Sequence, residues 1–141
     1  MEIGKPPIAI LMAVYEPRMD WLREQLLSLE AQTYPNLRLY ICDDCSPTVP
    51  HEEIRRCVEE CIHSFPYELK RNESNLGSNK TFEVLTQEVT GEYFAYCDQD
   101  DVWFPDKIEK TLKRMNEEIS DLMKIYGERF TTLDESYKRT R

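Results

Sequence analysis

The chain has 141 residues, of which 40% are hydrophobic and 32% are charged, and its formal net charge is -9. This length suits one globular domain with a core of its own. The negative charge argues against a protein that binds nucleic acid along its phosphates, because such a protein needs a positive surface.

The sequence contains no apolar run near the roughly 20 residues that span a bilayer, and its first residues lack the apolar core of a signal peptide. We therefore expect a cytoplasmic protein, either free or peripheral to the cytoplasmic membrane. The five cysteines are an odd number in such a chain, so reduced thiols are favoured over a disulfide framework.

Short apolar runs alternate with amphipathic stretches along the chain. They predict strands over 8–15, 37–42, 67–71 and 92–97, and helices that begin near Asp20, Pro50, Ser78 and Pro105. We expect Asp20 to cap the first helix and Gly91 to cap the end of the third. We also expect Phe82, Leu85 and Val89 to face inward from the third helix. This alternation predicts an α/β fold with a parallel, doubly wound sheet.

Ligands of such a sheet bind beyond the carboxyl ends of its strands. The predicted strands end at Tyr15, at Asp43 and Asp44, near residues 72–77, and at Asp98. The unusual polar clusters of this chain therefore fall on one edge of the sheet.

Three carboxylates, those of Asp98, Asp100 and Asp101, follow the last predicted strand. Asp98 and Asp100 are two residues apart in a tight turn, so both can face one divalent ion, and carboxylate oxygens suit Mg²⁺ or Mn²⁺. Such an ion would bridge the phosphates of a nucleotide and stabilise a departing diphosphate. The alternative interpretation is a solvated acidic turn.

Four segments carry a resemblance to a known family: IAILMAVYE, SLEAQTYPNLRLYICDDCS, NLGSNKTFEVL and TGEYFAYCDQDDVWFPDKIEKTL. Over about residues 7–115 the chain resembles the N-terminal half of family 2 glycosyltransferases, and most of all their bacterial rhamnosyltransferase-like members. The resemblance implies the Rossmann-like GT-A fold, with a mostly parallel sheet flanked by helices that stops after the Asp-x-Asp strand and a long helix.

The same resemblance implies an activity. It is the transfer of a sugar from a UDP- or dTDP-linked donor to a glycan or lipid-linked acceptor in bacterial surface polysaccharide synthesis, with Mn²⁺ or Mg²⁺ as cofactor. In such an enzyme a carboxylate base deprotonates the acceptor hydroxyl. No such base is recognisable after Asp101, so a nucleotide-sugar-binding remnant without transferase activity is the alternative.

Site roles follow from the resemblance position by position. Ala13, Val14, Tyr15 and Glu16 would line the base and ribose, although the family more often has Pro, Thr and Asn at positions 13, 14 and 16. Asp44 would accept a hydrogen bond from N3 of uracil or thymine, or else serve only in a turn.

Further roles come from the loop after the third strand and from the Asp-x-Asp turn. Asn75 and Gly77 would let the backbone approach the nucleotide. Lys80 would reach the sugar or phosphates, or else lie in solvent on a helix surface. Asp98 would contact ribose and metal, and Asp100 the metal.

Residue type and position alone suggest structural roles for three further side chains. We expect Asp43 to satisfy nearby backbone donors, and Trp103 and Phe104 to anchor the core.

Four cysteines raise a different possibility, a zinc-binding interaction module. Cys42, Cys45, Cys57 and Cys61 have the spacing C-x2-C-x11-C-x3-C, which is near that of structural zinc sites. However, Cys42 ends an apolar strand, and Cys57 and Cys61 lie on the inward side of a helix. Buried thiols are therefore the favoured interpretation.

We assign residues 1–127 to the donor-binding half and residues 128–141 to a polar tail. The long helix before that tail carries apolar residues at spacings of three and four, which predicts packing on the sheet or, alternatively, self-association. These residues are Ile108, Leu112, Met115, Ile119, Leu122 and Tyr126.

Overall fold

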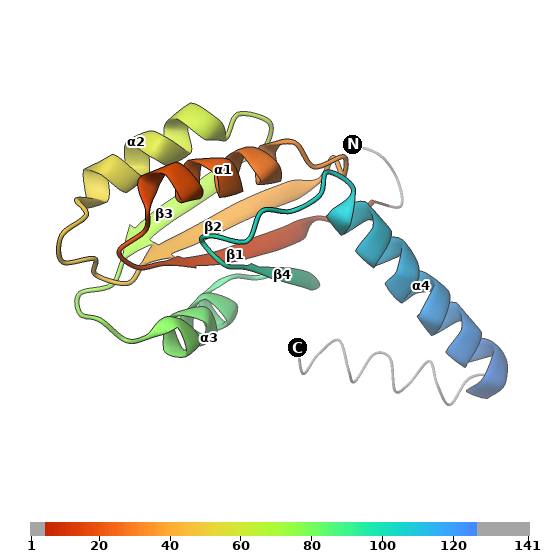
Figure 1. Ribbon diagram of the computed structural model, residues 1–141. Helices are drawn as coiled ribbons and strands as arrows, with labels where there is room; N and C mark the ends of the chain where they lie inside the picture. Colours follow the sequence, from red (N-terminus) through yellow and green to blue (C-terminus); the bar gives the residue numbers. More distant parts are fainter. Residues whose placement is uncertain (1–4, 127–141) are drawn as a thin grey trace. The chain divides into compact units, whose positions relative to one another are not determined.

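The computed structural model describes residues 5–126, with side chains as far as residue 124. Strands and helices alternate along this part of the chain, as the sequence predicts (Figure 1). The elements are β1 (Ile8–Val14), α1 (Met19–Glu30), β2 (Leu37–Asp43), α2 (His51–Cys61), β3 (Tyr67–Arg71), α3 (Ser78–Glu88), β4 (Tyr93–Cys97) and α4 (Lys107–Tyr126).

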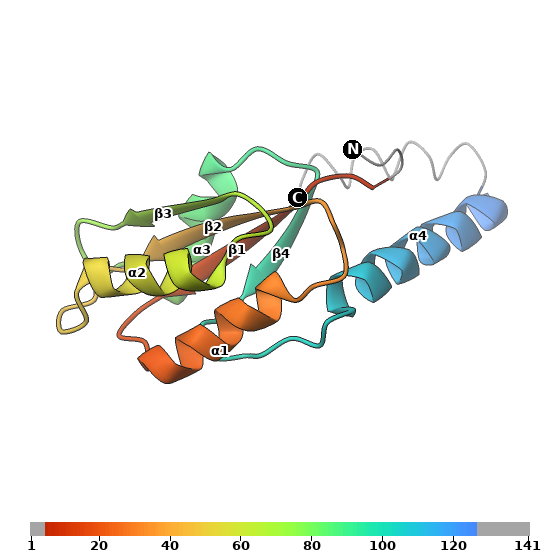
Figure 2. The ribbon, with the colours of Figure 1, turned by 90° about the horizontal axis from the view of Figure 1, so that it is seen from above.

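The described strands form one sheet in the order β3-β2-β1-β4, and every neighbouring pair is parallel. The carboxyl ends of the strands therefore share one edge. Helices α1 and α2 cover one face of the sheet and α3 covers the other (Figures 1 and 2). The chain order reverses at β1, which lies between β2 and β4, so this edge has the crevice where doubly wound sheets bind ligands. The predicted α/β fold is confirmed.

Apolar side chains fill both sides of the sheet. Ile10, Leu11 and Met12 of β1 are fully buried, as a strand covered on both faces requires. On the α3 side, Leu85 belongs to a buried cluster with Ala9, Leu11 and Cys42, and Phe82 and Val89 pack against this cluster. The predicted inward side of this helix is confirmed.

Two predicted helix caps are wrong. Helix α1 begins at Met19, so Asp20 lies inside the first turn, where its carboxylate accepts hydrogen bonds from Arg18 rather than capping the helix. Helix α3 ends at Glu88, and its C-cap residue is Val89 in an extended conformation, so Gly91 lies beyond the cap. At α1, the ion pair with Arg18 engages the Asp20 carboxylate. At α3, the chain becomes extended at Val89, before it reaches the glycine.

The segment after the Asp-x-Asp turn runs along α1. The backbone N–H of Trp103 donates to Ser28 Oγ at 3.1 Å, and Gln32 Nε2 donates to the Phe104 carbonyl at 2.7 Å. Trp103 is 5% exposed, which confirms it as a core anchor, but Phe104 is 82% exposed, so that prediction is wrong. With this backbone held against α1, only one of the two adjacent rings faces inward.

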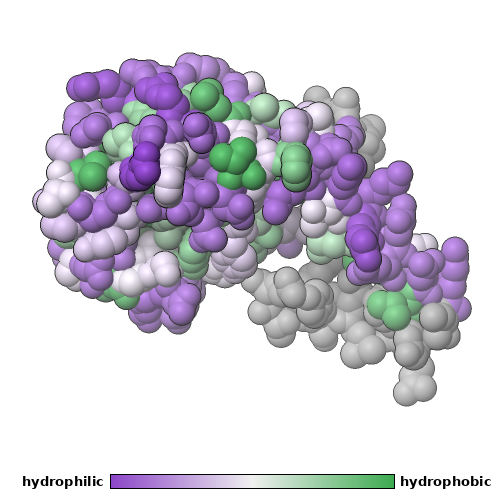
Figure 3. Space-filling model, in the orientation of Figure 1, coloured by the Kyte–Doolittle hydropathy of each residue, from purple (hydrophilic) through white to green (hydrophobic). Residues whose placement is uncertain are grey.

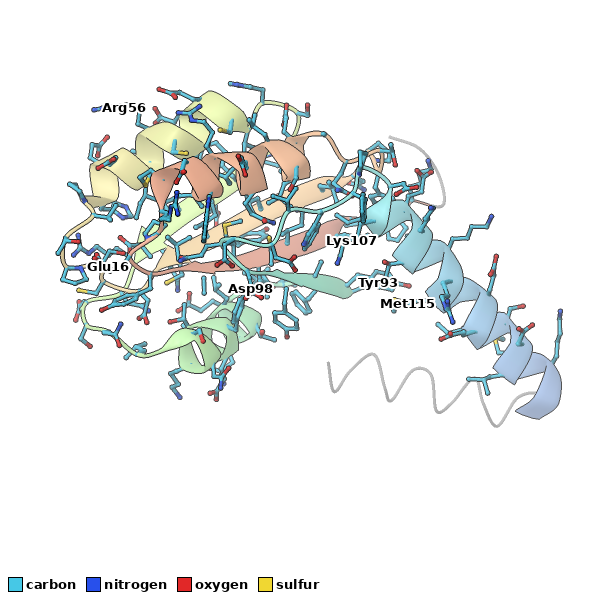
Figure 4. The ribbon with its side chains drawn as sticks, in the orientation of Figure 1. Glu16, Arg56, Tyr93, Asp98, Lys107 and Met115 are labelled. Carbon is cyan, nitrogen blue, oxygen red and sulfur yellow. The ribbon has the colours of Figure 1, made fainter. Side chains whose placement is uncertain are left out.

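The chain divides into two compact units, and the first ends at Pro105. The second contains α4, where Arg114 pairs with Glu118 one turn later. Met115, labelled in Figure 4, and Leu122 are 36% and 38% exposed. The side chain of Tyr126 and the predicted tail over 128–141 lie outside the described residues, and self-association through α4 stays a prediction.

The face of the molecule in Figure 3 is largely hydrophilic, with small and separate hydrophobic patches. Scattered patches of this kind are normal on a water-exposed surface. Across residues 5–126, each helix is too short or too polar to cross a bilayer.

Candidate functional site

A pocket lies at the carboxyl ends of β1 and β4 and contains about 190 Å³ of open space. It is assembled from segments that are far apart in sequence: the end of β1, the residue after β2, the first turns of α3, and the Asp-x-Asp turn after β4. Its lining residues are Ala13, Val14, Tyr15, Asp44, Ser78, Phe82, Asp98, Gln99 and Asp100. Six of the predicted site residues therefore line a single pocket.

Backbone hydrogen bonds hold the end of β1 between its neighbours. The Val14 carbonyl accepts from the backbone N–H of Asp44 at 2.8 Å, which places Asp44 directly beside β1. On the other side, the backbone of Tyr15 pairs with the side chain of Gln99. Tyr15 lines the pocket and is 44% exposed, so this aromatic residue is accessible to a ligand.

The Asp44 carboxylate is 2% exposed and organises the loop after β3. Its oxygens accept from the backbone N–H groups of Leu76 and Gly77, both at 2.8 Å, and from Asn72 Nδ2 at 2.9 Å. Burial raises the pKa of Asp44, but the hydrogen bonds from Leu76, Asn72, Gly77 and Thr81 outweigh burial, and the pKa is lowered overall. Asp44 is thus an anionic acceptor at neutral pH. The Thr81 side chain is a fourth hydrogen-bond partner of this carboxylate, so its roughly four acceptor positions are already used within the protein.

Asp43 has a structural role, as predicted. Its side chain is fully buried, and Oδ1 accepts from the backbone N–H of Ser46 at 3.1 Å and from Ser46 Oγ at 2.7 Å. Its other oxygen lies 3.2 Å from His51 Nδ1. These contacts hold the connection between β2 and α2.

Glu16, which is labelled in Figure 4, follows β1 but does not line the pocket. Its carboxylate accepts from the hydroxyl of Thr48 and from the backbone N–H groups of Thr48 and Val49. The Thr48 hydroxyl, then its N–H, lower the pKa of Glu16. The backbone of Glu16 has a φ of +45°, and its N–H donates to Ser46 Oγ. The structure therefore uses Glu16 to fasten the loop before α2.

Asp98 and Asp100 are both exposed at the pocket, on either side of Gln99. No described lysine, arginine or histidine forms an ion pair with either carboxylate. Within residues 5–126 there is no cluster of three or more metal-binding side chains. Asp98 and Asp100 are the two pocket carboxylates that could hold a cation, since Mg²⁺ can bind through one or two carboxylates together with phosphate oxygens and water.

The remaining predicted residues lie around the pocket but do not line it. Asn75 Nδ2 is 3.4 Å from the Asp44 carbonyl, and Gly77 precedes α3 with a φ of +88°. This φ is in the left-handed region that favours glycine. Lys80 is on the exposed surface of α3, where its Nζ lies 3.5 Å from Glu83. In this structure Lys80 belongs to the solvated surface of the helix.

Sequence reasoning missed Ser78, Gln99 and Asn72. Ser78 is the first residue of α3, and Gln99 is the middle residue of the Asp-x-Asp motif. Asn72 links three segments, since it donates to Asp44 and to Thr81 Oγ1 and accepts from the thiol of Cys42. In the sequence, the only feature that could have indicated a linking role for Asn72 and Gln99 is the side-chain amide, which can donate and accept hydrogen bonds at once.

The four cysteines do not form a zinc site. None of the four is in a disulfide, and three of them are buried: Cys42, Cys57 and Cys61. The thiol of Cys42 donates a hydrogen bond to Asn72 Oδ1. Burial raises the pKa of Cys42 and of Cys57 to about 11, so both are protonated thiols at neutral pH. The zinc alternative is therefore wrong, because within residues 5–126 no three metal-binding side chains come together: Cys42 lies on β2, whereas Cys57 and Cys61 lie on α2.

A parallel sheet with a pocket at its crevice places the chain in the class of doubly wound α/β proteins, which bind ligands beyond the carboxyl ends of their strands. Comparison with known sequences gives the family: "Glycosyl transferase family 2" matches residues 9–139. The chain belongs to glycosyltransferase family 2.

Two relatives illustrate the match. The chain is 30% identical over 115 residues to the putative teichuronic acid biosynthesis glycosyltransferase TuaG of Bacillus subtilis, covering 80% of this chain and 43% of TuaG. It is 36% identical over 88 residues to an uncharacterized glycosyltransferase of Haemophilus influenzae, covering 62% of this chain and 28% of that protein. The chain thus spans less than half the length of either relative.

Solved structures show the same GT-A fold. TarS 1-349 of S. aureus in complex with UDP-GlcNAc has a TM-score of 0.68 at 21% identity, over 79% of this chain and 31% of that chain. The mannosyltransferase PcManGT of Pyrobaculum calidifontis, in complex with GDP-Man and Mn²⁺, has a TM-score of 0.63 at 21% identity, over 72% of this chain and 29% of that chain.

Proposed function

We propose that this chain is the donor-binding part of a metal-dependent glycosyltransferase that takes a UDP- or dTDP-linked sugar. The pocket carries the proposal, because it joins an exposed aromatic residue, a buried anionic acceptor and two exposed carboxylates at the crevice of the sheet. An aromatic side chain can stack on a base, an anionic acceptor can bind a base N–H, and two carboxylates can hold the cation that accompanies a diphosphate. Membership of family 2 supports the reaction type.

In this proposal, Asp98 and Asp100 hold Mn²⁺ or Mg²⁺ together with the diphosphate. The ion supplies charge stabilisation for the diphosphate when the bond to the sugar breaks. The protein's own contribution would be the two carboxylates of Asp98 and Asp100 at one rim of the pocket, which would hold the ion. The structure of PcManGT with Mn²⁺ supports a role for such an ion on this fold.

Base selection is proposed to rest on Asp44. The carboxylate is anionic and lines the pocket, and the N3–H of uracil or thymine would bind it by taking the place of one of its present donors, such as the Thr81 side chain. The fold does not determine the base, since the neighbouring structures contain UDP-GlcNAc in one case and GDP-Man in another. We therefore expect UDP and dTDP to bind more tightly than GDP.

The acceptor is proposed to be a glycan or lipid-linked saccharide of a bacterial surface polysaccharide, and dTDP-rhamnose is included among the donors. The name of TuaG, which refers to teichuronic acid biosynthesis, supports a polysaccharide product. Five free cysteines support a reducing, cytoplasmic location.

A second candidate is a protein that binds the nucleotide sugar without transferring it. The pocket of the described residues is sufficient for binding a nucleotide sugar, and binding alone requires no catalytic base. Incubation with Mn²⁺, dTDP-rhamnose or UDP-hexoses and a panel of glycan acceptors separates the two candidates. Glycoside product over many turnovers supports the transferase, whereas donor binding without product supports the binding protein.

The donor-binding proposal is tested by calorimetric titration with UDP, dTDP and GDP, each with Mn²⁺ and in excess chelator. We expect Asp100→Asn to remove the metal-dependent part of the UDP affinity. The matched control is Asp101→Asn, which makes the same charge change one residue away at an exposed position outside the pocket lining. Equal UDP affinity with and without metal refutes the metal role, and GDP binding as tight as UDP refutes the role of Asp44.

A further inference from the structure

The side chain of Gln99 pairs with the backbone of Tyr15 across 84 residues of sequence. The backbone N–H of Tyr15 donates to Gln99 Oε1 at 2.8 Å, and Gln99 Nε2 donates to the Tyr15 carbonyl at 3.1 Å. Both residues line the pocket. A primary amide carries one acceptor and two donor hydrogens, so it can match the donor and the acceptor of one residue at once.

This pairing continues the β1–β4 ladder beyond its last backbone pair. The register of the two strands ends at Met12 opposite Cys97, although β1 itself continues to Val14 beside β2. After Cys97 the backbone of β4 turns away into the Asp-x-Asp turn. The side chain of Gln99 then supplies the partner that a further residue of β4 would have supplied.

The two hydrogen bonds join the groups that the proposed function assigns to two different parts of the ligand. Tyr15 belongs to the segment assigned to the base and ribose, and Gln99 lies between the two carboxylates assigned to the metal. Two like charges close together on an exposed turn repel each other, so the turn needs a fixed attachment to hold both at one rim.

We propose, resting on the donor-binding function above, that Gln99 is a positioning residue that couples metal binding to nucleotide binding. With the amide in place, the turn over residues 98–100 is held against Tyr15. A metal at the turn and a nucleotide on β1 can then contact each other without further ordering of the turn. Without the amide, the metal still binds at the turn and the nucleotide still binds at β1, but binding of one ligand no longer increases the affinity for the other. By linkage, metal and nucleotide then lose affinity for each other by the same factor.

The test uses Gln99→Met, which keeps a long unbranched side chain but removes both hydrogen bonds. Gln99→Glu is the second variant, because it keeps the acceptor for the Tyr15 N–H and loses the donor. The matched control is Gln87→Met, at an exposed position of α3 outside the pocket lining. Amide hydrogen exchange at Tyr15 and titrations of uridine and UDP, with and without Mn²⁺, are measured on the full chain.

We expect Tyr15 to exchange faster in Gln99→Met and to remain protected in Gln87→Met. In the wild type, Mn²⁺ strengthens UDP binding; in Gln99→Met this strengthening falls about tenfold, which corresponds to about 1.4 kcal/mol of lost coupling. Metal-free uridine affinity stays within about threefold, because Ala13 and Val14 of the base segment remain paired with β2. Gln99→Glu is expected to fall between Gln99→Met and the wild type.

If Gln99→Met retains the full Mn²⁺ effect on UDP, the coupling is refuted while the donor-binding proposal stands. If the variant loses uridine and UDP affinity equally, Gln99 only supports the fold and the inference is again refuted. If the wild type itself binds no nucleotide with or without Mn²⁺, the proposed function fails and the coupling fails with it.

Discussion

Replacing Asp44 by asparagine removes one acceptor from a buried and fully hydrogen-bonded carboxylate. In the wild type, Oδ1 accepts from Leu76 and Asn72, and Oδ2 accepts from the N–H of Gly77. In Asp44→Asn the amide nitrogen replaces one of these oxygens and faces a donor. We expect a loss of about 2–3 kcal/mol in the free energy of unfolding, because hydrogen bonds to charged groups contribute about 1.5–3 kcal/mol and a buried donor is left unpaired.

The assay is urea unfolding at pH 7, repeated at successively lower pH. The pKa of Asp44 is lowered in the folded protein, so its contribution is present above the unfolded value of about 4 and is lost as the pH falls through the folded pKa. Protonated Asp44 resembles asparagine in charge and in acceptors. The difference between wild type and Asp44→Asn is therefore expected to shrink in this acidic range.

Asp100→Asn is the matched control, because Asp100 is exposed and the substitution changes the charge by the same amount. A surface substitution of this kind is expected to change the free energy of unfolding by less than about 0.5 kcal/mol. If Asp44→Asn is as stable as Asp100→Asn at pH 7, then Asp44 does not hold the loop over residues 72–77, and the reasoning is refuted.

Three further predictions concern the same unit of the structure. Gly77→Ala is expected to lower the free energy of unfolding by about 1–2 kcal/mol, because a Cβ at a φ of +88° is strained although it meets no neighbour within 4 Å; an unchanged melting temperature contradicts this. Trp103→Ala is expected to cost about 3–5 kcal/mol, whereas Phe104→Ala, at an 82% exposed ring, is expected to stay within about 0.5 kcal/mol; equal melting temperatures for the two variants contradict the assignment. Cys42 and Cys57 are expected to react with a thiol reagent only after unfolding, because burial raises the pKa of both to about 11; rapid labelling of either residue in the folded protein at pH 7 contradicts their burial.

Sequence alone was sufficient for the order of strands and helices and for the edge of the sheet that carries the site. Hydrophobic periodicity reflects burial directly, and the continuous apolar run of β1 is what a strand covered on both faces requires. Because carboxyl ends of parallel strands meet, the polar residues after β1, β2 and β4 were expected together, and Asp44, Asp98 and Asp100 do line one pocket.

Tertiary structure decided which atoms of these residues are already engaged. Glu16 and Asp44 are both acidic residues at the end of a strand, yet Glu16 holds the loop before α2, whereas Asp44 holds the loop before α3 and still lines the pocket. The difference depends on donors more than 25 residues away, such as the N–H groups of Thr48 and Gly77. Local residue pattern carries no information about such distant donors.

The roles of Trp103, Phe104 and Gln99 also could not be predicted from the local sequence. Two adjacent aromatic residues look alike in sequence, but their backbone is hydrogen-bonded to the side chains of Ser28 and Gln32, and Trp103 is buried whereas Phe104 is exposed. Gln99 is unremarkable between two aspartates until the fold brings Tyr15 within hydrogen-bonding distance. Sequence determined which chemical groups stand at the edge of the sheet, because periodicity and strand ends are local properties. The fold alone decided how those groups are paired, because pairing depends on contacts between residues that are distant along the chain.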